Sequence, residues 1–233
     1  MAAKKARVDS MRSHLGNVKG RSSDVRERLL VYDGKIIKAE RSTVQFLTAA
    51  EKKKLGFSTK ATVVRRTQKK GWGSGKSQNL FQSLACLLHP KLFPRVIASE
   101  KRVAYSELVK LDRESQEAID LFYDRGDQPE RASKVRAHLK RIHSLNVTKV
   151  AEAIEKQSGL ELKTDAANVG IRPNGRLVFF SVYAIHLSTL EKRVATLSEK
   201  TDTQRIRKKA VVGILKEIKR SRPQQEYITL HSF

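Results

Sequence analysis

The sequence has 233 residues, 39% of them hydrophobic, which is enough to bury the core of one or two compact lobes. Its 48 Lys+Arg exceed its 24 Asp+Glu, and the formal net charge of +24 predicts an anionic polymer as partner. No apolar run approaches the ~20 residues that span a bilayer, so we expect no membrane insertion. The single cysteine, Cys86, excludes an internal disulfide framework and a zinc ribbon, which favours a reducing compartment, cytosolic or nuclear, and we expect a cytoplasmic location.

Residues 1–27 alternate cations with Ser, Gly and Asp without a sustained period, and we predict a flexible N-terminal arm there. The segment LLVYDGKIIK predicts a hairpin that turns at Asp33-Gly34, because this dipeptide tolerates positive φ. Thr48 and Glu51 have the spacing of a helix capping box, and Gly56 predicts the end of that short helix. The lysines at positions 52–54 are expected in solvent.

The stretch RRTQKKGWGSGKSQN, residues 65–79, combines cations, glycines and the only tryptophan without any carboxylate. Phosphates would neutralise the cations, the glycines let a sugar-phosphate backbone approach, and an exposed indole stacks on a base for roughly 1–3 kcal/mol. The alternative is a solvated hairpin loop whose tryptophan lies in the core. A P-loop is excluded because Lys70 stands where that motif requires a glycine. The candidate nucleic-acid-binding residues of this central loop are Arg65, Arg66, Lys69, Lys70, Trp72 and Lys76.

A core helix is predicted from Ser77 to Pro90, and residues 101–124 predict further helices broken near Asp112. The carboxylates of that segment are interpreted as a solvated face, because no nucleophile or metal-ligand spacing accompanies them. A turn in RGDQPER predicts a lobe boundary near residue 127. The next helix has a predicted buried stripe and many cations on its other sides; the stripe consists of Ala132, Val135, Leu139 and Ile142. Its two histidines, His138 and His143, are expected on the surface rather than as metal ligands.

The C-terminal third of the sequence gives clear stop and start signals. A helix from Thr148 should end at Gly159, and Pro173-Asn174-Gly175 predicts a turn into RLVFFSVYAIHL, which fits either a buried strand or a core helix. Ser188 and Glu191 have the spacing of another capping box. Thr201 or Asp202 should open the longest helix, whose narrow apolar stripe suits docking on a neighbouring surface; the stripe consists of Ile206, Ala210, Ile214 and Ile218.

The order of these features resembles the nucleoproteins of orthobunyavirus-like segmented negative-strand RNA viruses. The similarity covers most of residues 27–195 and follows LLVYDGKIIK, ATVV with the basic loop, NLFQSLACLL, and VAEAIEKQSGLELKTDAANVGIRPNGRLVFFSVYAIHLSTLEKR. The family's loop rich in Pro, Gly, Asn and Arg is replaced here by GWGSGK. The resemblance implies a mostly helical two-lobed fold that holds RNA between its lobes and joins protomers through terminal arms. It also implies that cations of the second lobe face the RNA; these are Arg136, Lys140, Arg141, Arg172 and Arg176.

We therefore expect a mainly α fold with a few short β-hairpins, two lobes around a basic cleft, and flexible N- and C-terminal arms. The expected segments are an arm at 1–27, lobes at 28–126 and 127–201, and a C-terminal helix or arm at 202–233. The expected function is non-enzymatic, sequence-tolerant binding and encapsidation of single-stranded RNA by a homo-oligomeric nucleoprotein, as in a virion ribonucleoprotein, without cofactor or metal. A viral RNA polymerase is a further expected partner.

Two other functions remain open from the sequence. A ribosome-associated or ribosome-assembly protein would carry similar charge and bind one structured RNA site as a monomer. A plasmid or phage DNA-binding regulator would need a recognition helix, and the segment around TDAANVGI is a poor one because Glu161 and Asp165 are acidic. An enzyme acting on nucleic acid would need clustered acids near metal-ligand spacing, which the sequence pattern does not show.

Overall fold

The computed structural model of the chain describes residues 36–38, 42–58, 62–68, 75–100, 102–123 and 130–229. The expected N-terminal arm and the turn at Asp33-Gly34 lie outside these residues. The chain divides into two units by backbone packing: unit 1 consists of Met1–Lys76 and Val96–Leu108, and unit 2 of Ser77–Arg95 and Val109–Phe233. The units thus interleave along the chain, whereas the sequence was interpreted as consecutive lobes, 28–126 and 127–201.

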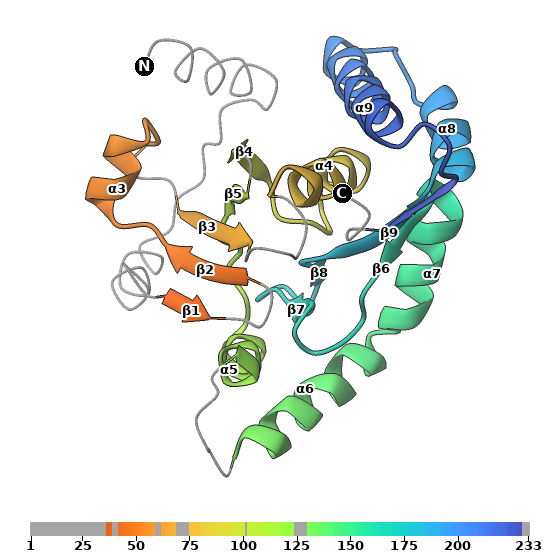
Figure 1. Cartoon of the computed structure of the whole chain (residues 1–233). Coiled ribbons are helices and arrows are strands. Elements are labelled where there is room, and N and C mark those ends of the chain that lie inside the picture. The colour runs from red at the N-terminus through yellow and green to blue at the C-terminus, as the bar shows by residue number, and fades with distance from the viewer. Residues whose placement is uncertain are drawn as a thin grey trace. The chain divides into compact units, whose positions relative to one another are not determined.

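Unit 1 is built on a five-stranded antiparallel sheet with the strand order β1-β2-β3-β5-β4. The strands are β1 (Ile36–Lys38), β2 (Ser42–Phe46), β3 (Val63–Gln68), β4 (Val96–Glu100) and β5 (Val103–Glu107) (Figure 1). The strand Ile36–Lys38 pairs with β2, in the register Ile37↔Val44. A small core lies on one face of the sheet, where the rings of Phe57 and Tyr105 are 5.2 Å apart.

The short helix α3 (Ala49–Lys54) begins and ends as its sequence predicts. Thr48 Oγ1 accepts the backbone N–H of Glu51 at 3.2 Å, and the Glu51 carboxylate accepts the Thr48 N–H at 2.9 Å. This capping box satisfies two N-terminal donors that the helix itself leaves unpaired. Gly56 follows the helix at φ +74°, a conformation that costs glycine little. Lys52 is buried, so the expectation that all three terminal lysines face solvent is wrong for this one.

Unit 2 contains six helices of the described chain and two small antiparallel sheets. The helices are α4 (Gly75–Leu88), α5 (Arg113–Tyr123), α6 (Arg131–Ser144), α7 (Val147–Ser158), α8 (Leu187–Ala195) and α9 (Asp202–Ser221). One sheet has the order β10-β9-β6, and the other pairs β7 with β8. The strands are β6 (Leu160–Leu162), β7 (Val169–Ile171), β8 (Leu177–Phe179), β9 (Val182–His186) and β10 (Tyr227–Thr229).

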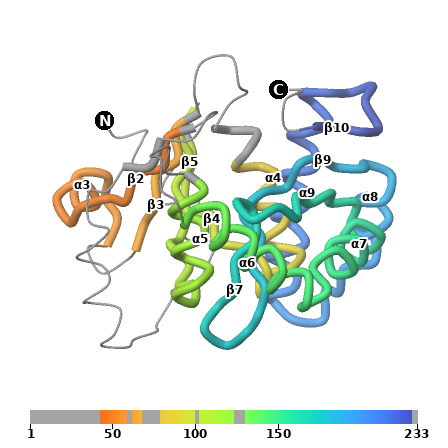
Figure 2. The backbone as a smooth tube through the Cα atoms, turned by 90° about the horizontal axis from the view of Figure 1, so that it is seen from below, coloured from red at the N-terminus to blue at the C-terminus, as the bar shows by residue number. Residues whose placement is uncertain are grey.

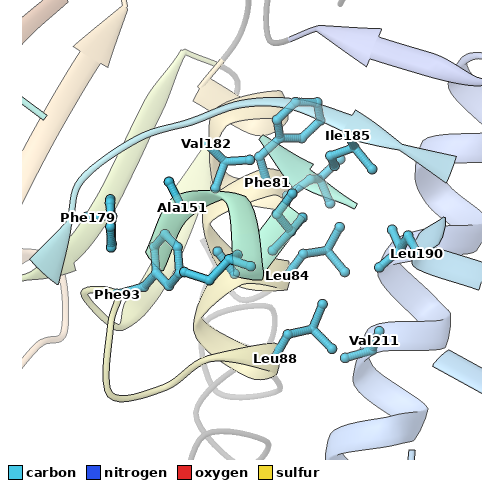
Figure 3. Close-up of a cluster of buried hydrophobic side chains, with 14 of the residues drawn as sticks. Phe81, Leu84, Leu88, Phe93, Ala151, Phe179, Val182, Ile185, Leu190 and Val211 are labelled. Atoms are coloured by element: carbon cyan, nitrogen blue, oxygen red, sulfur yellow. The ribbon is translucent and has the colours of Figure 1, made fainter. Parts of the chain in front are cut away.

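The main core of unit 2 surrounds α4, whose first residues precede the unit boundary. Phe81, Leu84 and Leu88 recur at helical spacing along α4 and are buried, as predicted. Figure 3 shows these side chains together with Ile185 of β9 and Leu190 of α8. Segments distant in sequence therefore share one apolar core, and burying it is the principal source of stability in this unit.

The apolar run RLVFFSVYAIHL forms two strands, β8 and β9, rather than one strand or one helix. β8 pairs with β7 across the predicted Pro173-Asn174-Gly175 turn, in the register Ile171↔Leu177. β9 pairs instead with β6 and β10, so the run changes partners within a few residues. Its β-branched and aromatic content is suited to strands buried on both sides.

The segment expected to be a C-terminal helix or arm begins with the helix α9, and residues 202–229 pack within unit 2 rather than extending from it as an arm. Thr201, one of the two predicted start residues, caps α9, and it forms a capping box with Gln204 that the sequence analysis did not predict. The buried side chains of α9 are Val211, Leu215 and Ile218, whereas Ile206 of the predicted stripe is 47% exposed. After α9 the chain returns to β9 and adds β10 (Figure 2). Ile228 of β10 is fully buried.

The fold is mixed α/β rather than mainly α. Among the described residues there are seven helices and three antiparallel sheets, and about half of these residues are helical. The main reason for the difference is unit 1, where Val96–Glu100 pairs with Val103–Glu107, and Val103–Glu107 also pairs with β3. Residues 103–107 were expected to be helical, and only the part after Asp112 forms a helix, α5.

Candidate functional site

Arg65 and Arg66 of the predicted central loop lie within β3 and are half-buried. Neighbouring residues of a strand point to opposite faces of its sheet, so the two side chains do not share a surface. Arg65 pairs with Gln45 and Tyr105 on the face that carries the unit 1 core. Its Nε is buried and has no hydrogen-bond partner among the described residues.

The environment of Arg65 is partly acidic. Glu51 accepts a hydrogen bond from the Gln45 amide at 2.7 Å. The backbone N–H of Thr48 is the main cause that lowers the pKa of Glu51, and the charge of Arg65 lowers it further. Arg65 therefore balances a carboxylate within unit 1, while Arg66 extends from the other face of the sheet.

The remaining central-loop residues cannot be placed as side chains. Lys69, Lys70 and Trp72 lie outside the described residues. Lys76 belongs to the first turn of α4, but its side chain is also outside the described part. The predicted role of these four residues stays a prediction.

Arg136 and Lys140 lie one turn apart on the exposed side of α6, opposite the buried His138 and Ile142. This separation is about 6 Å along the helix axis. The Arg136 Nε donates to the carbonyl of Ala132 at 3.1 Å, and neither cation forms an ion pair with a carboxylate of the described residues. Both positive charges are thus available at the surface.

Arg141, by contrast, is engaged by carboxylates of α5 and the residue before it. Its two terminal nitrogens donate to Asp112 at 3.3 and 2.7 Å, and Nη1 also lies 2.8 Å from Glu114. Partial burial acts to raise the pKa of Asp112, but hydrogen bonds from Arg141 and Ser115 outweigh it and leave the pKa lowered. Arg141 therefore joins α6 to the start of α5. The sequence predicted a contact with RNA for this residue and did not predict this structural role.

Arg172 and Arg176 are brought together by the β7–β8 turn. The Arg172 N–H donates to the Arg176 carbonyl at 2.8 Å, and Gly175 adopts φ +77° between them. Arg172 is half-buried, whereas Arg176 is exposed and forms no ion pair with a described carboxylate. The turn thus presents one freely accessible cation, Arg176.

His138 was expected at the surface and is instead 1% exposed. Its Nε2 lies 2.9 Å from the carbonyl oxygen of Val169, an acceptor, so Nε2 carries the proton. Burial is the main cause that lowers the pKa of this imidazole. The histidine therefore stays neutral and fastens α6 to β7.

A second exposed basic surface lies on α9. Lys209, Lys216 and Arg220 are exposed on one side of the helix, and none pairs with a carboxylate among the described residues. Gly213 lies between them, and a Cβ added at this position would have no atom within 4 Å. We call Lys209, Lys216 and Arg220 the α9 basic face; they span about 16 Å of helix.

The sequence interpretation missed a mixed cluster in unit 2. His186 Nε2 lies 3.4 Å from Glu155 Oε1 and 3.9 Å from Glu161 Oε2, and the three ligand atoms lie within 4.8 Å of one another. The residues come from α7, β6 and β9, and they are half-buried. Only the antiparallel pairing of β6 with β9 brings them together, so no local spacing could have indicated the cluster.

Tyr227 of β10 completes this cluster. It pairs with His186 across the sheet, with their rings 4.7 Å apart, and its hydroxyl donates to Glu161 Oε2 at 2.6 Å. This hydrogen bond, assisted by burial, raises the pKa of Tyr227 to about 12. The phenol therefore remains a hydrogen-bond donor throughout the physiological range. We call Glu155, Glu161, His186 and Tyr227 the Glu–His cluster.

No protein-family model matches the chain, and no curated protein matches it. Among solved structures, it is similar to one described as the structure of the streptomycin–ATP–APH(2″)-IIa ternary complex. The identity is 12%, the TM-score is 0.29, and the match covers 87% of this chain and 84% of that one. A likeness at this level carries no argument about fold or function. Within the described residues, no helix is both long and apolar enough to cross a membrane.

Proposed function

We propose that the protein binds single-stranded RNA with little sequence preference, as a nucleoprotein that coats its ligand. The observation that carries the proposal is the formal net charge of +24, far beyond what solubility requires. Phosphate neutralisation by Lys and Arg supplies affinity without reading sequence. The choice of RNA over DNA, and of coating over binding at one site, follows from the family resemblance.

The exposed cations of unit 2 support this proposal. Two surfaces, the outer side of α6 and the α9 basic face, present cations without carboxylate partners among the described residues. Three residues are both predicted to contact RNA and exposed in the structure, and we propose them as contacts: Arg136, Lys140 and Arg176. Arg141 is not a proposed contact, because Asp112 and Glu114 already bind its guanidinium.

The proposal is tested by fluorescence anisotropy with single-stranded RNA of mixed sequence, over a series of salt concentrations. One variant replaces three proposed contacts by alanine: Arg136, Lys140 and Arg176. A second replaces the α9 basic face: Lys209, Lys216 and Arg220. The control removes the same charge from exposed cations that already pair with carboxylates: Arg113, Lys134 and Arg205.

For single strands, each lost phosphate contact should flatten the slope of log K against log salt by about 0.7. We expect the first variant to lose up to about 2 units of slope, and the control to change it much less. If the first variant and the control have the same slope of log K against log salt, then α6 and the β7–β8 turn do not contact the RNA. A preference for one folded RNA, or for duplex DNA, would favour the ribosome-associated or the regulatory alternative.

Coating predicts that the mass of the complex grows with RNA length. Light scattering before and after nuclease treatment measures this directly. A monomer that binds a single equivalent of long RNA would contradict encapsidation. Assembly through residues 1–27 stays a prediction, because those residues lie outside the described part.

A further inference from the structure

We propose that the Glu–His cluster is a binding site for a divalent transition-metal cation, with Zn²⁺ as the expected ion and Glu155, Glu161 and His186 as its ligands. The inference does not depend on RNA binding. It rests on the donor set, on its spacing, and on how the fold holds each donor in place.

The donor set fits a borderline cation. Imidazole nitrogen suits zinc and its neighbours, and two carboxylates balance the ion's charge of two. Mg²⁺ and Ca²⁺ prefer oxygen ligands alone, so the histidine disfavours them. The cluster is not simply an acidic patch, because the imidazole is its central group and contacts both carboxylates.

The spacing is close to what coordination requires. Ligand atoms at about 2.0–2.1 Å from a tetrahedral Zn²⁺ lie about 3.4 Å apart. The Glu155–His186 separation is 3.4 Å and the Glu161–His186 separation is 3.9 Å. The largest separation is at most 4.8 Å, so the ligand atoms need to close by at most about 1.4 Å. Their side chains are 43% and 34% exposed, which permits this movement and leaves room for a water as fourth ligand.

The backbone around Gly159 positions two of the ligands. α7 ends at Gly159, whose N–H donates to the Glu155 carbonyl at 2.7 Å. The Gly159 carbonyl in turn accepts the His186 N–H at 2.8 Å. Gly159 has φ +70°, and an added Cβ would lie 2.5 Å from the His186 carbonyl oxygen. Glycine thus allows the end of α7 to approach β9 closely enough for Glu155 to reach the imidazole.

The sheet positions the other groups. Glu161 pairs with Ala184, and His186 follows two residues later on the same face of β9. Ala184 itself is fully buried. The hydroxyl of Tyr227 holds Glu161 Oε2, which is the kind of outer hydrogen bond that orients metal ligands. The three strands therefore fix two ligands and their support before any ion binds.

The test uses the full untagged chain, freed of metal by chelator, and titrates it with ZnCl₂ in a calorimeter at neutral pH. We expect one saturable equivalent. His186→Ala should abolish it, and Glu155→Gln should weaken it at least tenfold. Tyr227→Phe should weaken it about 10–100-fold if the phenol orients Glu161. Glu155→Gln keeps the shape of a half-buried side chain, so it remains informative if His186→Ala fails to fold.

Two matched variants control for adventitious binding. Glu152→Gln changes an exposed carboxylate one turn before Glu155, and His143→Ala removes an exposed histidine of α6. Both should bind Zn²⁺ like the wild type. The proposal is overturned if no saturable binding occurs, if His186→Ala and Glu155→Gln bind like the wild type, or if the controls lose binding equally. Displacement of Zn²⁺ by equimolar MgCl₂ would overturn the assignment to a transition metal.

Discussion

Replacing His89 by glutamine should remove part of the acid sensitivity of unit 2. His89 follows α4, and its Nε2 lies 3.1 Å from the hydroxyl oxygen of the fully buried Ser158. That hydroxyl donates its own proton to the Ile154 carbonyl at 2.7 Å, so the histidine must be the donor to Ser158. Burial, reinforced by the charge of Arg193, lowers the pKa of His89 to about 4.

The sign of the pH effect follows from this depressed pKa. As pH falls below about 6.5, the unfolded chain takes up a proton at His89 before the folded chain does, so the free energy of unfolding decreases. The stabilisation is complete above about 6.5 and is lost as pH falls towards 4. A depression from 6.5 to about 4, at about 1.4 kcal/mol per unit, corresponds to roughly 3 kcal/mol. His138, whose pKa burial also lowers, adds to the same trend.

Urea unfolding followed by circular dichroism between pH 4.5 and 7.5 measures this effect. The glutamine amide of His89→Gln can still donate to Ser158 but does not titrate. In the wild type, the free energy of unfolding should change more steeply with pH than in the variant, by up to about 1.4 kcal/mol per pH unit. This difference corresponds to one proton taken up on unfolding. His143→Gln is the control, because its ring is in water in both states. An unchanged slope in His89→Gln, or an imidazole NMR titration of His89 near 6.5, would refute the reasoning.

Two further predictions concern close contacts in unit 2. Gly159→Ala and Gly175→Ala both place alanine at positive φ, but only the Cβ at Gly159 meets an atom within 4 Å. In urea unfolding, Gly175→Ala should lower the free energy of unfolding by about 1 kcal/mol, and Gly159→Ala should lower it by at least about 1 kcal/mol more. Equal losses would mean that β9 moves away from the added Cβ at no energetic cost. Arg141→Met should destabilise the protein by about 1–3 kcal/mol because it removes the two guanidinium donors from the Asp112 carboxylate. A double-mutant cycle with Asp112→Asn should show coupling between the two residues, and strict additivity would contradict a direct interaction.

Local features of the fold could be predicted from the sequence. The capping box at Thr48, the start of α9 after Thr201, the helix end at Gly159, and the turn at Gly175 depend on residues within a few positions of one another. Each follows from backbone chemistry that does not need the rest of the chain. These predictions are confirmed. The box expected from Ser188 to Glu191 is wrong, since α8 begins at Leu187.

Features that depend on distant pairing could not be predicted. β5 was expected to be helical because its short pattern is ambiguous until β3 and β4 lie beside it. The engagement of Arg141 by Asp112 joins residues 29 positions apart. The Glu–His cluster needs residues from α7, β6 and β9, which only the sheet brings together.

His138 shows a different limit. Its position between Val135 and Ile142 suits the buried side of α6, but a polar side chain was assigned to solvent by its residue type. The Val169 carbonyl accepts a hydrogen bond from His138 and so offsets the cost of burying the imidazole, but it lies 31 positions away in the sequence. The period of the helix was the better guide in this case.

The position of β10 after α9, late in the order of synthesis, has a consequence for folding. β9 lies between β6 and β10, so one edge of β9 stays unpaired until Tyr227–Thr229 has left the ribosome. An unpaired apolar strand edge invites pairing with another chain. Polypeptides that terminate before Tyr227 should therefore aggregate or be degraded, although they retain all the helices of unit 2. Closing this edge of β9 therefore requires synthesis to proceed at least through Thr229.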